Sequence, residues 1–166
     1  LSGPKTQVRN ILGNASNLVF NTFVRPVAAG ADYMQHVLRG KKQEVFLGEV
    51  PAALHGLLTG IKTGIRKAHF VLKEGFTLDD VAALEFRGPE VKGGIYTNFV
   101  GRALEAADQF FRSIMFESEL HARAYADTIK RGLKGEAAEE AYKQFIASPP
   151  VKVIEEISRV ARRAVF

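Results

Sequence analysis

The chain has 166 residues, a formal net charge of +5, and neither cysteine nor tryptophan. This length is sufficient for one domain with a real core, and the 46% hydrophobic and 25% charged content is ordinary for a globular protein. The lack of cysteine excludes a disulfide framework and any cysteine-ligated metal site. No apolar run approaches the eighteen residues that would predict a membrane-spanning helix.

The positive charge is concentrated in the first half of the chain. Residues 1–75 hold ten Lys and Arg against four Asp and Glu, whereas residues 76–166 hold thirteen against fourteen. A basic half of this kind favours DNA or an anionic membrane surface as a partner. Because no run of five like charges occurs, a solvated basic face is the simpler interpretation, and both alternatives remain open.

The first predicted helix begins near Ser2 and Pro4, since proline is preorganised for a first helical turn. Pro26 is expected to end or kink this helix near Arg25, because proline interrupts helical hydrogen bonding. Helical spacing then continues over residues 27–38. Before the proline, one face is apolar and an adjacent face consists of amides. The apolar residues are Val8, Ile11, Leu12, Ala15, Leu18, Val19, Thr22 and Phe23.

A further helix is predicted from Pro51 to about Lys73, and small residues occupy every fourth position along it. Three of them are glycines, each of which costs about 1 kcal/mol of helix propensity relative to alanine. Close approach of another helix across this strip would offset that cost. We expect intramolecular packing, with a membrane or oligomer contact as the alternative. The predicted helix-packing strip is Ala52, Gly56, Gly60, Gly64 and Ala68.

Residues 75–97 form a break between longer helices. Thr77 and Asp80 resemble a capping box that opens a short helix reaching about Phe86. Residues 87–97 contain three glycines and a proline, which predicts an internal loop.

The longest predicted helix covers about residues 99–133 and contains no proline. Its apolar residues recur three and four positions apart, which is typical of one helical face. The other segments are expected to pack around it. The members of this face are Val100, Ala103, Leu104, Ala107, Phe110, Phe111, Ile114 and Met115, then Tyr125, Ile129 and Leu133.

Two short helices complete the chain. The first is predicted over residues 136–147, after a stop at Lys134 and Gly135. Ser148 is expected to cap the second, with Pro149 and Pro150 at its first positions. Three arginines near the end of this last helix suit the negative end of the helix dipole, and they also form a candidate basic contact. They are Arg159, Arg162 and Arg163.

Together these elements predict an all-α protein, a multi-helix bundle with one long central helix at about 99–133 and five or six other helices. Residues 1–166 form a single domain in this interpretation. The chain opens without methionine and stops within an apolar-periodic segment, so we expect it to be a fragment of a larger polypeptide.

No catalytic, cofactor-binding or metal-binding motif is found. The four histidines, His36, His55, His69 and His121, form neither HExxH nor HxxxH. Glu117 and His121 lie four residues apart on the central helix and could serve as an acid–base pair, but a structural contact is the commoner use of that spacing. We therefore expect no cofactor and no enzyme activity.

Two stretches resemble a known family. They are the opening segment LSGPKTQVRNIL at 1–12, with Asn14 and Asn17 following, and the segments GRAL at 101–104, ADQFFR at 107–112, ELHA at 119–122 and AYA at 124–126. The break IASPP at 146–150 fits the same pattern. These residues resemble a helical region of very large phage and prophage proteins of the polyvalent type. The resemblance covers about half of the chain and leaves residues 40–97 unmatched.

The resemblance implies a non-catalytic helical module within a virion-internal or ejected phage protein. Its partners would be other virion proteins or copies of itself, and its location the phage particle, with delivery into the host cell. The alternative is a basic helical module that binds DNA, or a membrane surface without spanning it, during genome delivery. Salt discriminates between them, because electrostatic binding to DNA weakens steeply as salt rises.

Overall fold

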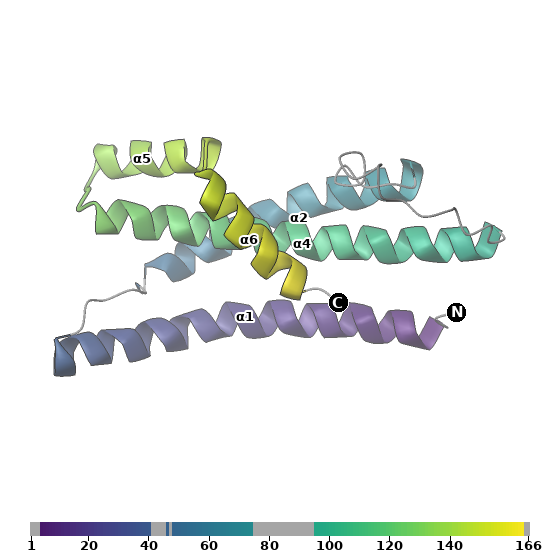
Figure 1. Ribbon diagram of the computed structural model, residues 1–166, viewed down its shortest axis with the longest axis horizontal. Coiled ribbons are helices and arrows are strands. Elements are labelled where there is room, and N and C mark those ends of the chain that lie inside the picture. Colours follow the sequence, from purple (N-terminus) through teal and green to yellow (C-terminus); the bar gives the residue numbers. More distant parts are fainter. Residues whose placement is uncertain (1–3, 41–45, 47, 75–94, 165–166) are drawn as a thin grey trace.

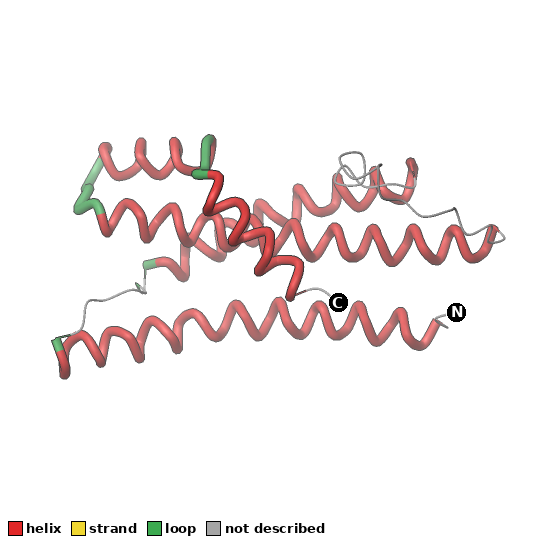
Figure 2. Tube along the Cα trace, in the orientation of Figure 1, coloured by secondary structure: helices red, strands yellow, loops and turns green. Residues whose placement is uncertain are grey.

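The structure is a computed structural model that describes residues 4–40, 46, 48–74 and 95–164. All regular structure in these residues is helical, as the sequence predicts (Figures 1 and 2). The helices are α1 (Pro4–Arg39), α2 (Glu49–Glu74), α4 (Ile95–Lys130), α5 (Glu136–Ala147) and α6 (Val151–Ala164). The short helix expected at 77–86 lies outside the described residues.

α4 is the central helix of the bundle. It packs along α2, and it also contacts α1, α5 and α6. In Figure 1, α5 lies along the C-terminal half of α4, and α6 crosses α4 in the direction of α1. Since α4 is covered on several sides, even polar residues on it are buried. They are Gln109, Ser113, His121 and Thr128.

α1 does not end at its proline. It is one helix of 36 residues that runs through Pro26. Of the two alternatives predicted at this proline, an end near Arg25 is therefore wrong, whereas the helical structure predicted over residues 27–38 is confirmed. Proline removes one N–H donor from the helical ladder, but its fixed φ of about −65° is itself helical. The helix therefore loses one hydrogen bond and continues on both sides. It ends before Gly40, which has a φ of +63° and whose N–H binds the carbonyl of His36 at 3.0 Å.

α4 begins four residues earlier and ends three residues earlier than predicted. No residue between Gly94 and Phe99 breaks a helix, so Ile95–Thr97 are helical, which corrects the end of the loop expected at 87–97. Residues 87–94 lie outside the described residues. At its C-terminus, Gly132 adopts a φ of +70°. The N–H groups of Gly132 and Leu133 then bind the carbonyls of Ile129 and Thr128, which is a Schellman motif.

The bounds of α5 agree with the prediction, but Ser148 does not cap α6. It is instead the residue that closes α5, where its N–H binds the carbonyl of Gln144 at 2.9 Å. α6 begins at Val151, and the carbonyl of Pro150 accepts its first hydrogen bonds, from the N–H groups of Val153 and Ile154. α6 thus begins two residues later than a cap at Ser148 would require.

A capping box without Ser or Thr begins α2. The N–H of Glu49 binds the carbonyl of Phe46 at 2.9 Å, and the carboxylate of Glu49 accepts the N–H of Phe46 at 2.8 Å. The reciprocal bonds satisfy two backbone groups at the start of the helix. They also explain why Glu49 is buried.

Candidate functional site: helix-packing surfaces

The glycines of the predicted strip face the backbone of α4. Gly56, Gly60 and Gly64 are all buried, whereas Ala52 and Ala68 at the two ends are half-buried. A Cβ atom built on Gly60 would lie 2.6 Å from the Cα of Ile114, and one built on Gly64 would lie 2.9 Å from the carbonyl oxygen of Phe110. Such distances leave no room for a methyl group.

The order of these contacts makes the two helices antiparallel. Gly56 lies against Glu117 and His121 of α4, whereas Gly64, further along α2, lies against Phe110. Residue numbers on α4 thus decrease as those on α2 increase. The hydroxyl of Ser118 also donates to the carbonyl of Ala53 at 3.0 Å, which joins the two helices at one end of the strip. The three glycines of the strip are therefore packed against α4 within the chain, as the intramolecular alternative predicts.

Three aromatic side chains from three helices meet beside this strip. The Nδ1 atom of His121 lies 2.5 Å from the hydroxyl of Tyr142 on α5 and 3.4 Å from Nδ1 of His55 on α2. Burial raises the pKa of Tyr142, so the phenol keeps its proton and can donate it to Nδ1 of His121. In that arrangement His121 is neutral, with its proton on Nε2.

Electrostatics also keep His121 neutral. Burial lowers the pKa of His121, and the neighbouring His55 lowers it further. Glu117 lies on the other side of the ring, with Oε2 4.0 Å from Nε2, which is too long for a hydrogen bond. Burial raises the pKa of Glu117, against the opposing effect of Lys67. In this geometry the carboxylate of Glu117 makes no direct hydrogen bond to the imidazole of His121.

No metal site is found in the part of the chain that the structure describes. No group of three or more His, Asp or Glu side chains in it is placed to hold a metal ion. Likewise, none of the described helices is long and apolar enough to cross a membrane.

The predicted basic contact at the end of α6 is only partly described. Arg159 is exposed, whereas the side chains of Arg162 and Arg163 lie outside the described set. Earlier in α6, Glu156 pairs with Arg123 of α4, which also binds Glu119 at 3.0 Å. The arginine holds the pKa of Glu156 below its usual range and ties α6 to the central helix.

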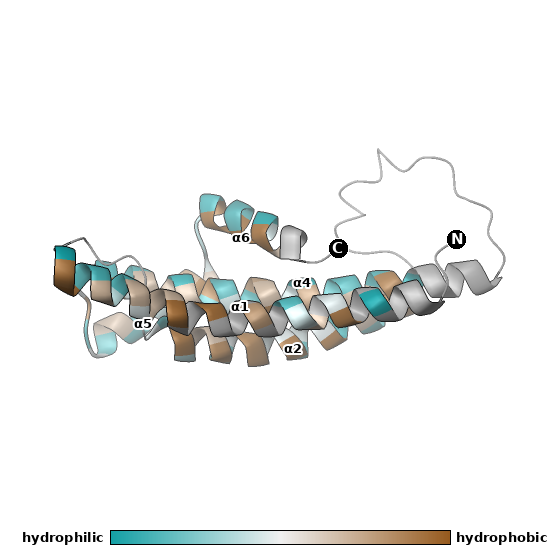
Figure 3. Ribbon diagram, turned by 90° about the horizontal axis from the view of Figure 1, so that it is seen from below, coloured by the Kyte–Doolittle hydropathy of each residue, from teal (hydrophilic) through white to brown (hydrophobic). Residues whose placement is uncertain are grey.

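Two apolar faces, on α1 and α2, are exposed in the structure, and this exposure is not predicted by the sequence. Figure 3, which views the molecule from the α1 side, shows hydrophobic residues along both helices. The residues on α1 are Leu12, Phe20, Val24, Val27, Tyr33, Met34, Val37 and Leu38. Those on α2 are Leu54, Leu58, Ile65 and Leu72.

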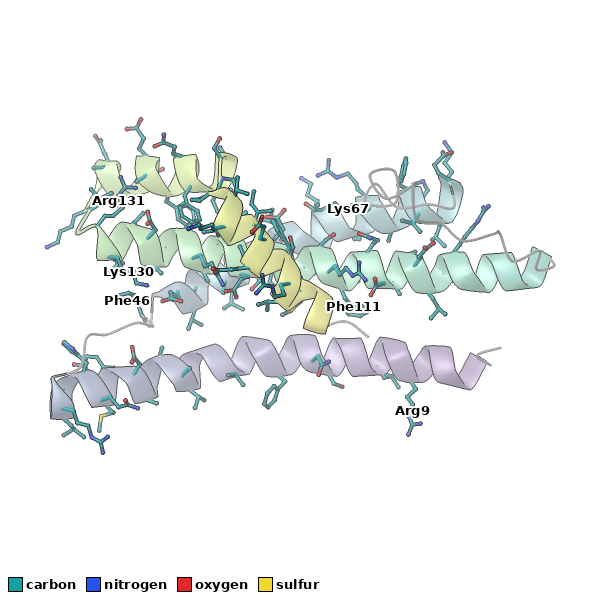
Figure 4. The ribbon with its side chains drawn as sticks, viewed as in Figure 1. Arg9, Phe46, Lys67, Phe111, Lys130 and Arg131 are labelled. Carbon is teal, nitrogen blue, oxygen red and sulfur yellow. The ribbon has the colours of Figure 1, made fainter. Side chains whose placement is uncertain are left out.

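The exposed face of α2 differs from that of α1 in its charge. Between Glu49 and Glu74, α2 contains no acidic residue, and its basic residues lie beside the apolar stripe. Figure 4 labels one of its lysines, Lys67, and shows long side chains projecting from this helix. The basic residues next to the stripe are Lys62, Arg66, His69 and Lys73, all of them exposed.

Comparison with family models, curated proteins and solved structures finds no significant match to this chain.

Proposed function

We propose that this chain is a non-catalytic assembly module of a large phage virion-associated protein, internal or ejected. It acts through helix–helix packing with copies of itself or with partner virion proteins. The observation that supports this proposal best is the pair of exposed apolar faces on α1 and α2. Monomeric proteins rarely leave such continuous apolar stripes in water, and they commonly mark interaction sites.

The α2–α4 pair supplies the rigid part of this module. Backbone contact through the glycine strip fixes the two helices, and the buried Ile114 and Val71 fill the space beside them. A scaffold of this kind holds the outer face of α2 in a constant arrangement relative to α4. In this proposal the phage setting derives from the resemblance, and the module itself makes and breaks no covalent bond.

A second candidate is the binding of DNA or an anionic membrane surface. The observation in its favour is α2, where exposed basic residues border exposed apolar ones, as in helices that lie in a membrane interface. In this alternative, Lys62, Arg66 and Lys73 would contact phosphate groups.

Sedimentation velocity of the chain over a concentration series, at low and high salt, separates the two. The assembly proposal predicts larger species whose fraction rises with concentration and persists at high salt, since apolar burial is not screened. A chain that remains monomeric at every concentration contradicts it. Binding to DNA or to vesicles containing phosphatidylserine that weakens steeply with salt would then favour the second candidate.

A further inference from the structure

The exposed face of α1 contains a regular seam. Its members are spaced alternately four and three residues apart, and all are exposed. They are Phe20, Val24, Val27, Ala31, Met34 and Leu38. Val27 and Leu38 each retain 73% of their accessible surface, whereas Ala29, on the opposite side of the helix, is fully buried. The seam thus points away from the rest of the bundle.

This spacing specifies the kind of partner. Alternating steps of four and three are the a and d positions of a heptad, which pack as knobs into holes on another helix. The seam spans about 27 Å at 1.5 Å per residue. A helical partner with the same repeat would cover all six positions.

The charge around the seam indicates which helix that partner is. The flanking e and g positions that the structure describes are Ala28, Gly30, Gln35 and Val37, none of which is charged. Between Phe20 and Leu38 the only charged residues are Arg25 and Asp32, both at heptad position b, away from the seam. An anionic membrane or DNA would favour bordering Lys and Arg. Two copies of α1 can therefore pack seam against seam without like-charge repulsion. Two copies of the apolar face of α2 would bring Lys62 and Arg66 of one copy close to those of the other, and these positive charges would repel.

We infer that α1 is a dimerisation helix, whose seam packs antiparallel against the same seam of a second copy. This inference rests on the proposed assembly function and names its partner and surface. An antiparallel pair centred on Ala29 places each a residue opposite a d residue. Phe20 then faces Leu38, Val24 faces Met34, and Val27 faces Ala31. The small residues at Ala28, Gly30 and Ala31 allow close approach at the centre. One surface used twice closes the dimer around a two-fold axis.

The first experiment compares matched pairs of substitutions by sedimentation velocity. The double variant Val27→Lys and Met34→Lys places four lysines in the seam of each dimer. The control, Leu58→Lys and Ile65→Lys, makes the same change on the exposed face of α2. All four residues are exposed, so each variant should keep the helical content of the parent chain, which circular dichroism verifies.

The expected result is loss of the dimer in the α1 variant and its retention in the α2 variant. If the α1 variant remains a dimer and the α2 variant becomes monomeric, dimerisation through the α1 seam is wrong. The proposed assembly through apolar faces would still stand in that case. A parent chain that is monomeric at every concentration would overturn both the inference and self-assembly.

The second experiment tests the antiparallel arrangement by disulfide cross-linking. The chain has no cysteine, so introduced ones are unique. Mixing Phe20→Cys protein with Leu38→Cys protein under oxidising conditions should give cross-linked dimers containing one chain of each kind. Either variant alone should give none, because two copies of residue 20 would lie about 27 Å apart. Cross-linking of Phe20→Cys protein with itself would contradict this geometry.

Discussion

Gly60 of α2 lies so close to Ile114 of α4 that a methyl group on the glycine would be 2.6 Å from the Cα of the isoleucine. The substitution Gly60→Ala would add helix propensity, but the contact atom belongs to the backbone and cannot turn aside. We expect the helices to move apart, with a net loss of about 1–3 kcal/mol in the free energy of unfolding, as for other overpacked cores. Urea denaturation of the variant and the parent chain measures this change in the free energy of unfolding.

Gly13→Ala is the matched control for this substitution. Gly13 also lies within a long helix, but no atom is within 4 Å of the position its Cβ would take. We expect this variant to gain up to about 1 kcal/mol. If both substitutions changed the free energy of unfolding equally, the close approach of α2 and α4 at Gly60 would not limit the size of the residue there.

The contact between His121 and Tyr142 makes stability depend on pH. Because the pKa of His121 is lowered in the fold, mainly by burial, the unfolded chain binds a proton more readily than the folded one. The contribution of His121 is therefore complete above its ordinary pKa of 6.5, and it is lost as the pH falls below that value. Unfolding free energies at pH 7.5, 6.5 and 5.5 should decrease in that order.

The variant His121→Asn identifies the source of this slope. It should be less stable than the parent chain at pH 7.5, since the smaller amide loses the ring contacts with His55 and Tyr142, and it should lose less stability between pH 7.5 and 5.5, since asparagine does not titrate. An identical slope in both proteins would assign the pH dependence to other groups.

The contribution of Glu117 to stability changes with pH in the opposite direction to that of His121. Burial raises its pKa, so the charged carboxylate is penalised in the folded state at neutral pH. Glu117→Gln removes that penalty and should raise the unfolding free energy at pH 7, by an amount that shrinks as the pH falls and the parent carboxyl becomes protonated. A loss of stability at pH 7 would mean that the carboxylate is well paired in the fold.

α6 is held on α4 by Ile157, which is fully buried. Truncation to alanine leaves a cavity beneath the helix, and we expect Ile157→Ala to cost about 2–4 kcal/mol. Ile154→Ala, on the same helix but partly exposed, should cost less. Hydrogen exchange of the α6 amides would show whether the loss is local, with faster exchange in α6 than in α2.

Periodicity predicted the helical class and the central position of α4, because each helix buries a face at regular spacing. The bounds of α5 followed from the glycine before it and the prolines after it. The spacing of the apolar residues indicated that helical structure resumes after Pro26, but it could not decide whether the proline ends the helix or only kinks it. The ring removes one N–H donor and crowds the carbonyl four residues earlier, and the surrounding residues decide whether the helix continues.

Contacts between distant parts of the chain leave no periodic signal in the sequence. His55, His121 and Tyr142 are separated by 66 and 21 residues, and no local spacing links them. The exposed seam of α1 was hidden for a related reason. Phe20 and Val24 were not among the residues assigned to the apolar face of this helix, and a pattern shows that a face is apolar but not what covers it.

The most direct test of the assembly account is the mass of the chain in solution, measured by sedimentation equilibrium at several concentrations in low and high salt. The account predicts association that strengthens with concentration, persists at high salt, and depends on the apolar face of α1. A monomer under all these conditions would contradict it.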